Sequence, residues 1–232
     1  MRLLVSVMDA AEARTAAAAG ADIVDVKNPA EGSLGAPSPA VIASVRAAVP
    51  AGQPVSAAIG DMPNLPGTAA LAALGAARSG AAFVKVGLWG VSTEDDAVAL
   101  LRAVREAVPD VVVVAAAYAD AERVEHAPLA PELLPRVAGA AGVGACLLDT
   151  AVKDGRGLLE WLSPESLASL VAEAHDAGLD VALAGALSAS DLPVVRDTGA
   201  DIAGVRSAAC GDGRRSAPLD AARVRALVVA TR

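Results

Sequence analysis

The chain of 232 residues is 54% hydrophobic and 20% charged, with a formal net charge of -8. This composition suffices for a large buried core, and an acidic balance without any Lys/Arg-rich run argues against a nucleic-acid-binding surface. No apolar run approaches the roughly 18 residues of a membrane span, and the first residues lack a signal-peptide pattern, so we expect a cytoplasmic protein with no membrane partner.

Short apolar runs rich in β-branched residues alternate with alanine-rich helical stretches along the chain. The runs predicted as strands are residues 3–7, 22–27, 54–60, 83–87, 111–118, 144–150, 180–185 and 201–206. The predicted helices are residues 9–20, 38–49, 67–80, 92–108, 130–142, 163–178, 188–199 and 217–230. Strand-helix units without a linker predict one domain over residues 1–232, a single TIM-type (β/α)8 barrel rather than a doubly wound open sheet.

Lysine is rare in this chain. Of the 19 basic residues 16 are arginine, and only Lys27, Lys85 and Lys153 are lysine. Arginine stays protonated in proteins, whereas a buried lysine can become a neutral amine that acts as a base or attacks a carbonyl. Lys27 ends the second predicted strand, Lys85 lies near the end of the fourth, and Lys153 follows the sixth. Because active sites of such barrels lie at the C-terminal strand ends, we expect the three lysines in one pocket rather than as separate solvated charges.

Two carboxylates accompany these lysines. Asp25 shares a strand face with Lys27, and Asp149 closes the sixth predicted strand just before Lys153. Burial and neighbouring ammonium groups lower a lysine pKa from about 10.4, which favours Schiff-base chemistry on a carbonyl. Lys27 is the predicted covalent residue, because a regular strand fixes its position, and Lys85 supplies a nearby positive charge. We expect Asp149, Asp25 and the remaining lysines to take part in acid-base steps.

Small residues after the last two strands predict a phosphate site, because TIM barrels often bind phosphate there through backbone N–H groups. The candidate residues of this site are Gly185, Ala186, Gly204 and Arg206. A second candidate anion-binding turn lies in "NPAEGSLGAP", through Ser33, Leu34 and Gly35. The alternative is that the small residues of both segments only form tight turns and bind no anion. The expected partner is a small phosphorylated molecule, and a homo-oligomer stays open.

The sequence predicts neither a metal nor a cofactor. The two histidines, His126 and His175, fall in a loop and near a helix end without a metal-binding spacing. No P-loop, G-x-S-x-G elbow or dinucleotide-binding glycine motif follows a strand. Cys146 and Cys210 are too few and too far apart for a disulfide framework. Tyr118 is expected to wall the pocket or to pack in the core.

Five segments carry a family resemblance: "DVKNPAEGSLGAP", "VSAAIGDMPNLPGTAALAALGAARSGAAFVKVGL", "LLDTAVKDG", "ALAGAL" and "DIAGVRSAAC". They closely resemble the (5-formylfuran-3-yl)methyl phosphate synthase family, also called 4-(hydroxymethyl)-2-furancarboxaldehyde-phosphate synthase. The resemblance implies a TIM-barrel carbon-oxygen lyase that condenses two molecules of glyceraldehyde 3-phosphate, as at the start of the furan part of methanofuran. It also implies that Lys27 is the Schiff-base lysine and that Lys85, Asp149 and Lys153 are the other catalytic groups.

Two other readings remain compatible with the sequence. Another Schiff-base triose-phosphate aldolase of the barrel type would keep the lysines and release an open-chain product. A non-catalytic barrel would bind sugar phosphates without turnover, and the full set of lysines and carboxylates argues against it.

Overall fold

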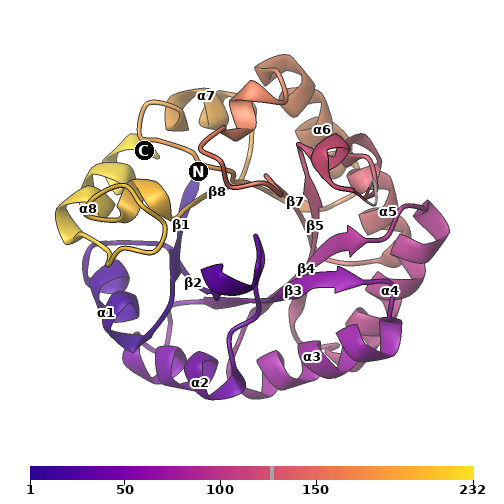
Figure 1. Ribbon diagram of the computed structural model, residues 1–232, viewed down its shortest axis with the longest axis horizontal. Helices are drawn as coiled ribbons and strands as arrows, with labels where there is room; N and C mark the ends of the chain where they lie inside the picture. Colours follow the sequence, from indigo (N-terminus) through magenta and orange to yellow (C-terminus); the bar gives the residue numbers. More distant parts are fainter. Residues whose placement is uncertain (126–127) are drawn as a thin grey trace.

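The expected TIM-type barrel is confirmed by the computed structural model, which describes residues 1–125 and 128–232. Eight parallel strands close in the order β1 to β8: β1 (Arg2–Val7), β2 (Ile23–Val26), β3 (Val55–Pro63), β4 (Phe83–Gly90), β5 (Val112–Tyr118), β6 (Ala145–Asp149), β7 (Asp180–Leu183) and β8 (Ile202–Val205). The helices that surround them (Figure 1) are α1 (Ala10–Ala18), α2 (Pro39–Ala48), α3 (Pro66–Arg78), α4 (Glu94–Ala107), α5 (Leu134–Ala141), α6 (Pro164–Asp176), α7 (Leu192–Asp197) and α8 (Ala221–Ala230).

Parallel pairing brings the C-terminal ends of all strands to one mouth. β1 pairs with β2 on one side and with β8 on the other, which closes the ring. Successive side chains of a strand point alternately to the barrel interior and to the helix layer. On β2, Val24 packs in the outer core beneath the helices, whereas Ile23 belongs to the cluster inside the barrel. The same period places Asp25 and Lys27 on the interior side.

Several helices begin where the sequence supplies a capping side chain. Asp9, Ser38 and Thr93 accept hydrogen bonds from backbone N–H groups in the first turns of α1, α2 and α4. Along α4, buried Leu100 and Leu101 pack onto the barrel, and the opposite face is polar. These caps fix where α1, α2 and α4 start, and therefore how much chain remains before each of them to form the mouth.

β3 and β4 run beyond their predicted ends at residues 60 and 87. Irregular pairing extends them, with Asp61 opposite Gly87 and Pro63 opposite Gly90. Gly60 has a φ of 118°, a left-handed conformation that a residue with a side chain adopts only with strain. This bulged extension places Asp61 at the mouth of the barrel.

The helix predicted for residues 188–199 is shorter in the structure, because its first residues form a capped turn. Asp191 accepts hydrogen bonds from the Ser188 backbone N–H at 2.8 Å and from the Ser188 hydroxyl at 2.7 Å. Only residues 192–197 are helical. In the described part of the chain, no helix is both long and apolar enough to cross a membrane.

Candidate active site

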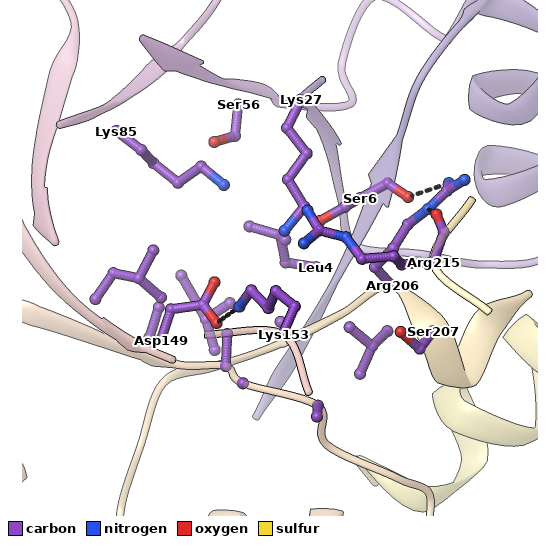
Figure 2. A pocket seen from close by; sticks show the side chains of 18 of the residues that line it. Leu4, Ser6, Lys27, Ser56, Lys85, Asp149, Lys153, Arg206, Ser207 and Arg215 are labelled. Atoms are coloured by element: carbon purple, nitrogen blue, oxygen red, sulfur yellow. Dashed lines mark hydrogen bonds and ion pairs between the residues drawn. The ribbon is translucent and has the colours of Figure 1, made fainter. Parts of the chain in front are cut away.

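A cavity of about 340 Å³ opens at the C-terminal mouth and continues into the barrel. Lys27, Lys85, Asp149 and Lys153 all line it, and Figure 2 shows their polar ends directed toward one space. Deeper in the barrel its wall is apolar, with Leu4 among the lining residues. The structure thus brings together side chains that are far apart in the sequence, while their catalytic roles stay a prediction.

Two of the three lysines are held by carboxylates. Lys85 Nζ lies 2.6 Å from Asp25 Oδ1, and both side chains are almost completely buried. Ser6 donates to the other oxygen of Asp25 at 2.9 Å. Lys153 Nζ donates to Asp149 Oδ1 at 2.7 Å, and the Lys153 side chain is 21% exposed. Asp25 therefore lies behind Lys85 and does not line the cavity itself.

Lys27 differs from the other two lysines. Within the described residues, no carboxylate oxygen lies within 4 Å of its amine, and the residue is only 8% exposed. Burial lowers the pKa of Lys27 from 10.5 to about 8; Asp149 opposes this change, and the charges of Lys85 and Lys153 add to it. The arrangement therefore yields one buried amine that is partly neutral near physiological pH.

Asp149 is an anion under the same conditions. Burial alone would raise the pKa of Asp149, but the ammonium groups of Lys153 and Lys27 outweigh burial and bring it to about 2. The backbone N–H of Thr150 donates to the same carboxylate at 2.8 Å. The mouth of the barrel thus combines a fixed carboxylate, a partly neutral amine and two amines that are paired with carboxylates.

The turn after β7 presents backbone donors to the cavity. Gly185 and Ala186 line it and have φ values of 111° and 49°, the latter in the left-handed region that alanine rarely adopts. Among the described residues, their N–H groups have no hydrogen-bond partner. Gly204 and Ser207 line the cavity from the adjacent strand end. Free N–H groups beside a cavity suit an anionic ligand.

The prediction that Arg206 binds a phosphate stays a prediction, and the structure gives its guanidinium partners within the protein. Arg206 lines the cavity, but its guanidinium donates to both oxygens of Glu12 and to the carbonyl oxygens of Ser6, Arg215 and Ala217. These bonds use all five N–H donors of the side chain. Arg206 and Glu12 form a nearly buried ion pair that fixes the loop after β8 to β1 and α1.

Three arginines that the sequence did not single out also line the cavity, Arg156, Arg214 and Arg215, and Arg215 is the least exposed of them. It is half-buried in the loop after β8, and it donates one hydrogen bond, to the carbonyl oxygen of Gly32 at 3.0 Å. Figure 2 shows Arg215 among the residues that line the cavity. The only sequence signal for it was its position shortly after the eighth strand, which Arg214 shares.

The turn of residues 28–35 does bind an anion, but that anion is part of the protein. The N–H groups of Ser33 and Leu34 donate to Asp61, at 2.8 and 3.2 Å. Ser33 is buried, and neither it nor Gly35 lines the cavity. Asp61 therefore occupies the N–H donors of Ser33 and Leu34, and contact of Ser33 or Gly35 with the substrate stays a prediction.

The remaining candidates lie away from the cavity or in its wall. Tyr118 is fully buried and packs edge-on against Trp89, with ring centroids 5.4 Å apart. Cys146 and Cys210 are buried free thiols. His175 pairs with Asp201 on the surface, and His126 lies outside the described residues. Within those residues, no group of three or more potential ligand side chains is placed to hold a metal ion.

Known proteins resemble this chain over nearly its whole length. The family model for 4-HFC-P synthase matches residues 3–228. A (5-formylfuran-3-yl)methyl phosphate synthase of Methanocaldococcus jannaschii is 50% identical over 220 residues, 93% of each chain. A protein of the same name from Methanopyrus kandleri is 51% identical over 219 residues, 93% of this chain and 92% of that one.

Solved structures give the same fold. A 3-hexulose-6-phosphate synthase superposes over 100% of both chains with a TM-score of 0.65, and its 21% sequence identity shows likeness of fold alone. The family match and the two close relatives go further, since they cover the strand ends that carry the lysines. The chain therefore belongs to the (5-formylfuran-3-yl)methyl phosphate synthase family.

Proposed function

We propose that this protein is a lyase that condenses two molecules of glyceraldehyde 3-phosphate into (5-formylfuran-3-yl)methyl phosphate. Family membership supports the product, because the relatives bear the name of this enzyme. The atoms balance when the two trioses lose one phosphate and two molecules of water. Such a reaction needs several proton transfers in one pocket, which suits a cluster of amines and carboxylates.

The observation that carries the mechanism is the state of Lys27. With a pKa of about 8, roughly one amine in ten is neutral at pH 7, against about one in 3,000 for a pKa of 10.5. The neutral amine attacks the aldehyde carbon of one triose, a C–N bond forms, and the aldehyde oxygen leaves as water. The resulting iminium accepts the electrons released when the neighbouring carbon loses its proton. Those electrons then return to expel phosphate from the third carbon.

The other two lysines are assigned different tasks because they are held differently. Lys85 is buried and fixed by Asp25, so we assign it a permanent positive charge that favours the neutral form of Lys27. Lys153 is on a loop, is partly exposed and contacts Asp149, so it can follow the reacting oxygens. We assign proton delivery during phosphate loss, ring closure and dehydration to the pair of Lys153 and Asp149.

We place the phosphate group that the product keeps at the turn after β7. The unpartnered N–H groups of Gly185 and Ala186 among the described residues support this placement, and Ser207 lies at the adjacent strand end. Arg215 provides the nearby cation, since the donors of Arg206 are already used. Lys27 and Lys85 then lie deeper in the barrel, at the aldehyde end of the substrate.

The test is incubation of the purified protein with glyceraldehyde 3-phosphate as the only substrate. We expect a product with the mass and ultraviolet absorbance of a formylfuran phosphate, together with free phosphate. An open-chain product would identify another aldolase, and saturable binding without turnover would identify a binding barrel. The matched control is Lys27→Arg, which keeps the charge and removes the nucleophile. It should fold, as shown by circular dichroism, and form no product.

A further inference from the structure

Asp61 is a charged group at the mouth that the proposed chemistry does not use. Its carboxylate accepts hydrogen bonds from the hydroxyl of Tyr118 and from the backbone N–H groups of Ser33 and Leu34. Among the described residues, no lysine or arginine lies within 4 Å of it. Asp61 is therefore stabilised by dipoles that converge from β5 and from residues 28–35.

The sequence leaves room for this carboxylate on two sides. A Cβ atom at Gly32, which has a φ of 126°, would overlap Asp61 Oδ2. A Cβ atom at Gly87, opposite Asp61 on β4, would overlap the hydroxyl of Tyr118 and would lie 3.0 Å from Asp61 Oδ1. Glycine therefore stands at both places where a side chain would prevent the contact.

Residues 28–35, which we call the 28–35 loop, begin directly after Lys27 and cover part of the mouth. Leu34 of this loop is fully buried and belongs to the cluster of side chains inside the barrel. The hydroxyl of Ser33 donates to the carbonyl oxygen of Thr150, next to Asp149, at 2.8 Å. The loop thus ties the end of β2 to the end of β6, with Asp61 as its anchor on β3.

We propose that Asp61 is a positioning residue that holds the 28–35 loop, with Leu34 inserted in the barrel, so that water is kept from Lys27. The importance of this role rests on the proposed function, in which Lys27 is the nucleophile. The Lys27 pKa itself can be measured without substrate. Burial is the largest cause of the lowered pKa of Lys27. A loop that moves away should hydrate the amine and raise that pKa.

The direction in which the Lys27 pKa changes when Asp61 is replaced distinguishes loss of the loop from loss of the Asp61 charge. Lys27 is faced by Asp25 from its own strand, Lys85 from β4, Asp149 from β6 and Lys153 from the loop after β6. Removing the negative charge of Asp61 would by itself lower the pKa of a nearby amine or leave it unchanged. An increase therefore reports hydration, which is the effect of losing the loop.

The test compares Asp61→Asn with Asp22→Asn. The amide introduced by Asp61→Asn keeps the size of the side chain. It has one acceptor oxygen, whereas the donors around Asp61 bond to two carboxylate oxygens in the wild type. Asp22 also accepts a backbone N–H, that of Leu3 at 2.7 Å, but it precedes β2 at the opposite end of the barrel. The readout is the pH dependence of Lys27 acetylation by acetic anhydride, followed by peptide mass spectrometry without substrate.

We expect Asp61→Asn to raise the Lys27 pKa far enough to leave about tenfold less neutral amine at pH 7. Asp22→Asn should leave the Lys27 pKa unchanged even where it lowers the melting temperature. Tyr118→Phe removes one donor to Asp61 and should move the pKa in the same direction by less, which keeps the test available if Asp61→Asn does not fold. An unchanged or lowered Lys27 pKa in the folded variants would overturn the proposal.

The activity assay separates this inference from the proposed function. If the unmodified protein makes no furan product, the proposed function fails, and the acetylation result still decides the role of Asp61. If the protein is active and Asp61→Asn retains both full turnover and the original Lys27 pKa, the proposed function stands and the positioning role is wrong.

Discussion

Replacing Lys27 with methionine should make the folded protein more stable at neutral pH, although it removes the proposed nucleophile. Burial lowers the pKa of Lys27 from 10.5 to about 8, Asp149 opposes the change, and Lys85 and Lys153 reinforce it. The charged amine is therefore less favourable in the folded protein than in the unfolded chain. Methionine has a similar length and no charge, so it fills the space without that penalty.

The magnitude follows from the two pKa values of Lys27. At pH 7 both states are mostly protonated, and the difference between 10.5 and about 8 costs the folded state roughly 3 kcal/mol. As the pH rises through about 8, the folded protein releases the proton, while the unfolded chain keeps it until about 10.5. The penalty therefore shrinks with rising pH, to about 1.5 kcal/mol at about pH 9.5.

Urea unfolding of the wild type and of Lys27→Met, at about pH 7 and about pH 9.5, measures this effect. We expect the variant to be more stable by up to about 3 kcal/mol at the lower pH, and by about half as much at the higher pH. A variant that is less stable than the wild type at pH 7 would refute the reasoning. An advantage that does not change with pH would refute it as well, because it would come from packing rather than from charge.

Three further results are expected. Lys85→Met should lose roughly 3–5 kcal/mol in the same unfolding assay, the opposite sign to Lys27→Met, because it leaves Asp25 buried without its counter-charge. Arg215→Ala should raise KM for glyceraldehyde 3-phosphate about tenfold with little change in melting temperature, whereas Arg206→Ala should lower the melting temperature. Equal effects of the two variants on KM would contradict the assignment of Arg215 as the cation near the phosphate. Burial raises the pKa of Asp149, and the adjacent ammonium groups lower it, with a net value of about 2. The contribution of Asp149 to stability should therefore disappear as the pH falls from about 4 to about 2, and Asp149→Asn should lack that part of the acid dependence.

The barrel was predictable because its signal is local. Each strand is a short apolar run, and several helices begin at a capping residue. The spacing of apolar residues in strands differs enough from that in helices to be distinguished in the sequence. The meeting of Lys27, Lys85 and Lys153 followed from topology, because a closed parallel barrel has a single mouth for all its strand ends. Rarity of lysine in an arginine-rich chain marked the residues without any structural information.

The partners of charged groups were not predictable in the same way. Arg206 lies at the strand end where a phosphate ligand was expected, but it contacts Glu12, a helix residue 194 positions away. Likewise, the donors of Ser33 and Leu34 meet Asp61, which a bulged extension of β3 carries to the mouth. Sequence position indicates which end of the barrel a group occupies, whereas the choice between a ligand and an internal partner depends on side-chain geometry.

Reductive trapping identifies the residue that forms the covalent bond with the substrate, which we propose is Lys27. The wild-type protein is incubated with glyceraldehyde 3-phosphate and sodium borohydride, digested, and mapped by mass spectrometry. We expect one stable adduct, on the peptide that contains Lys27, and no adduct in Lys27→Arg. An adduct on Lys85 or Lys153 instead, or furan formation by Lys27→Arg at the wild-type rate, would contradict it.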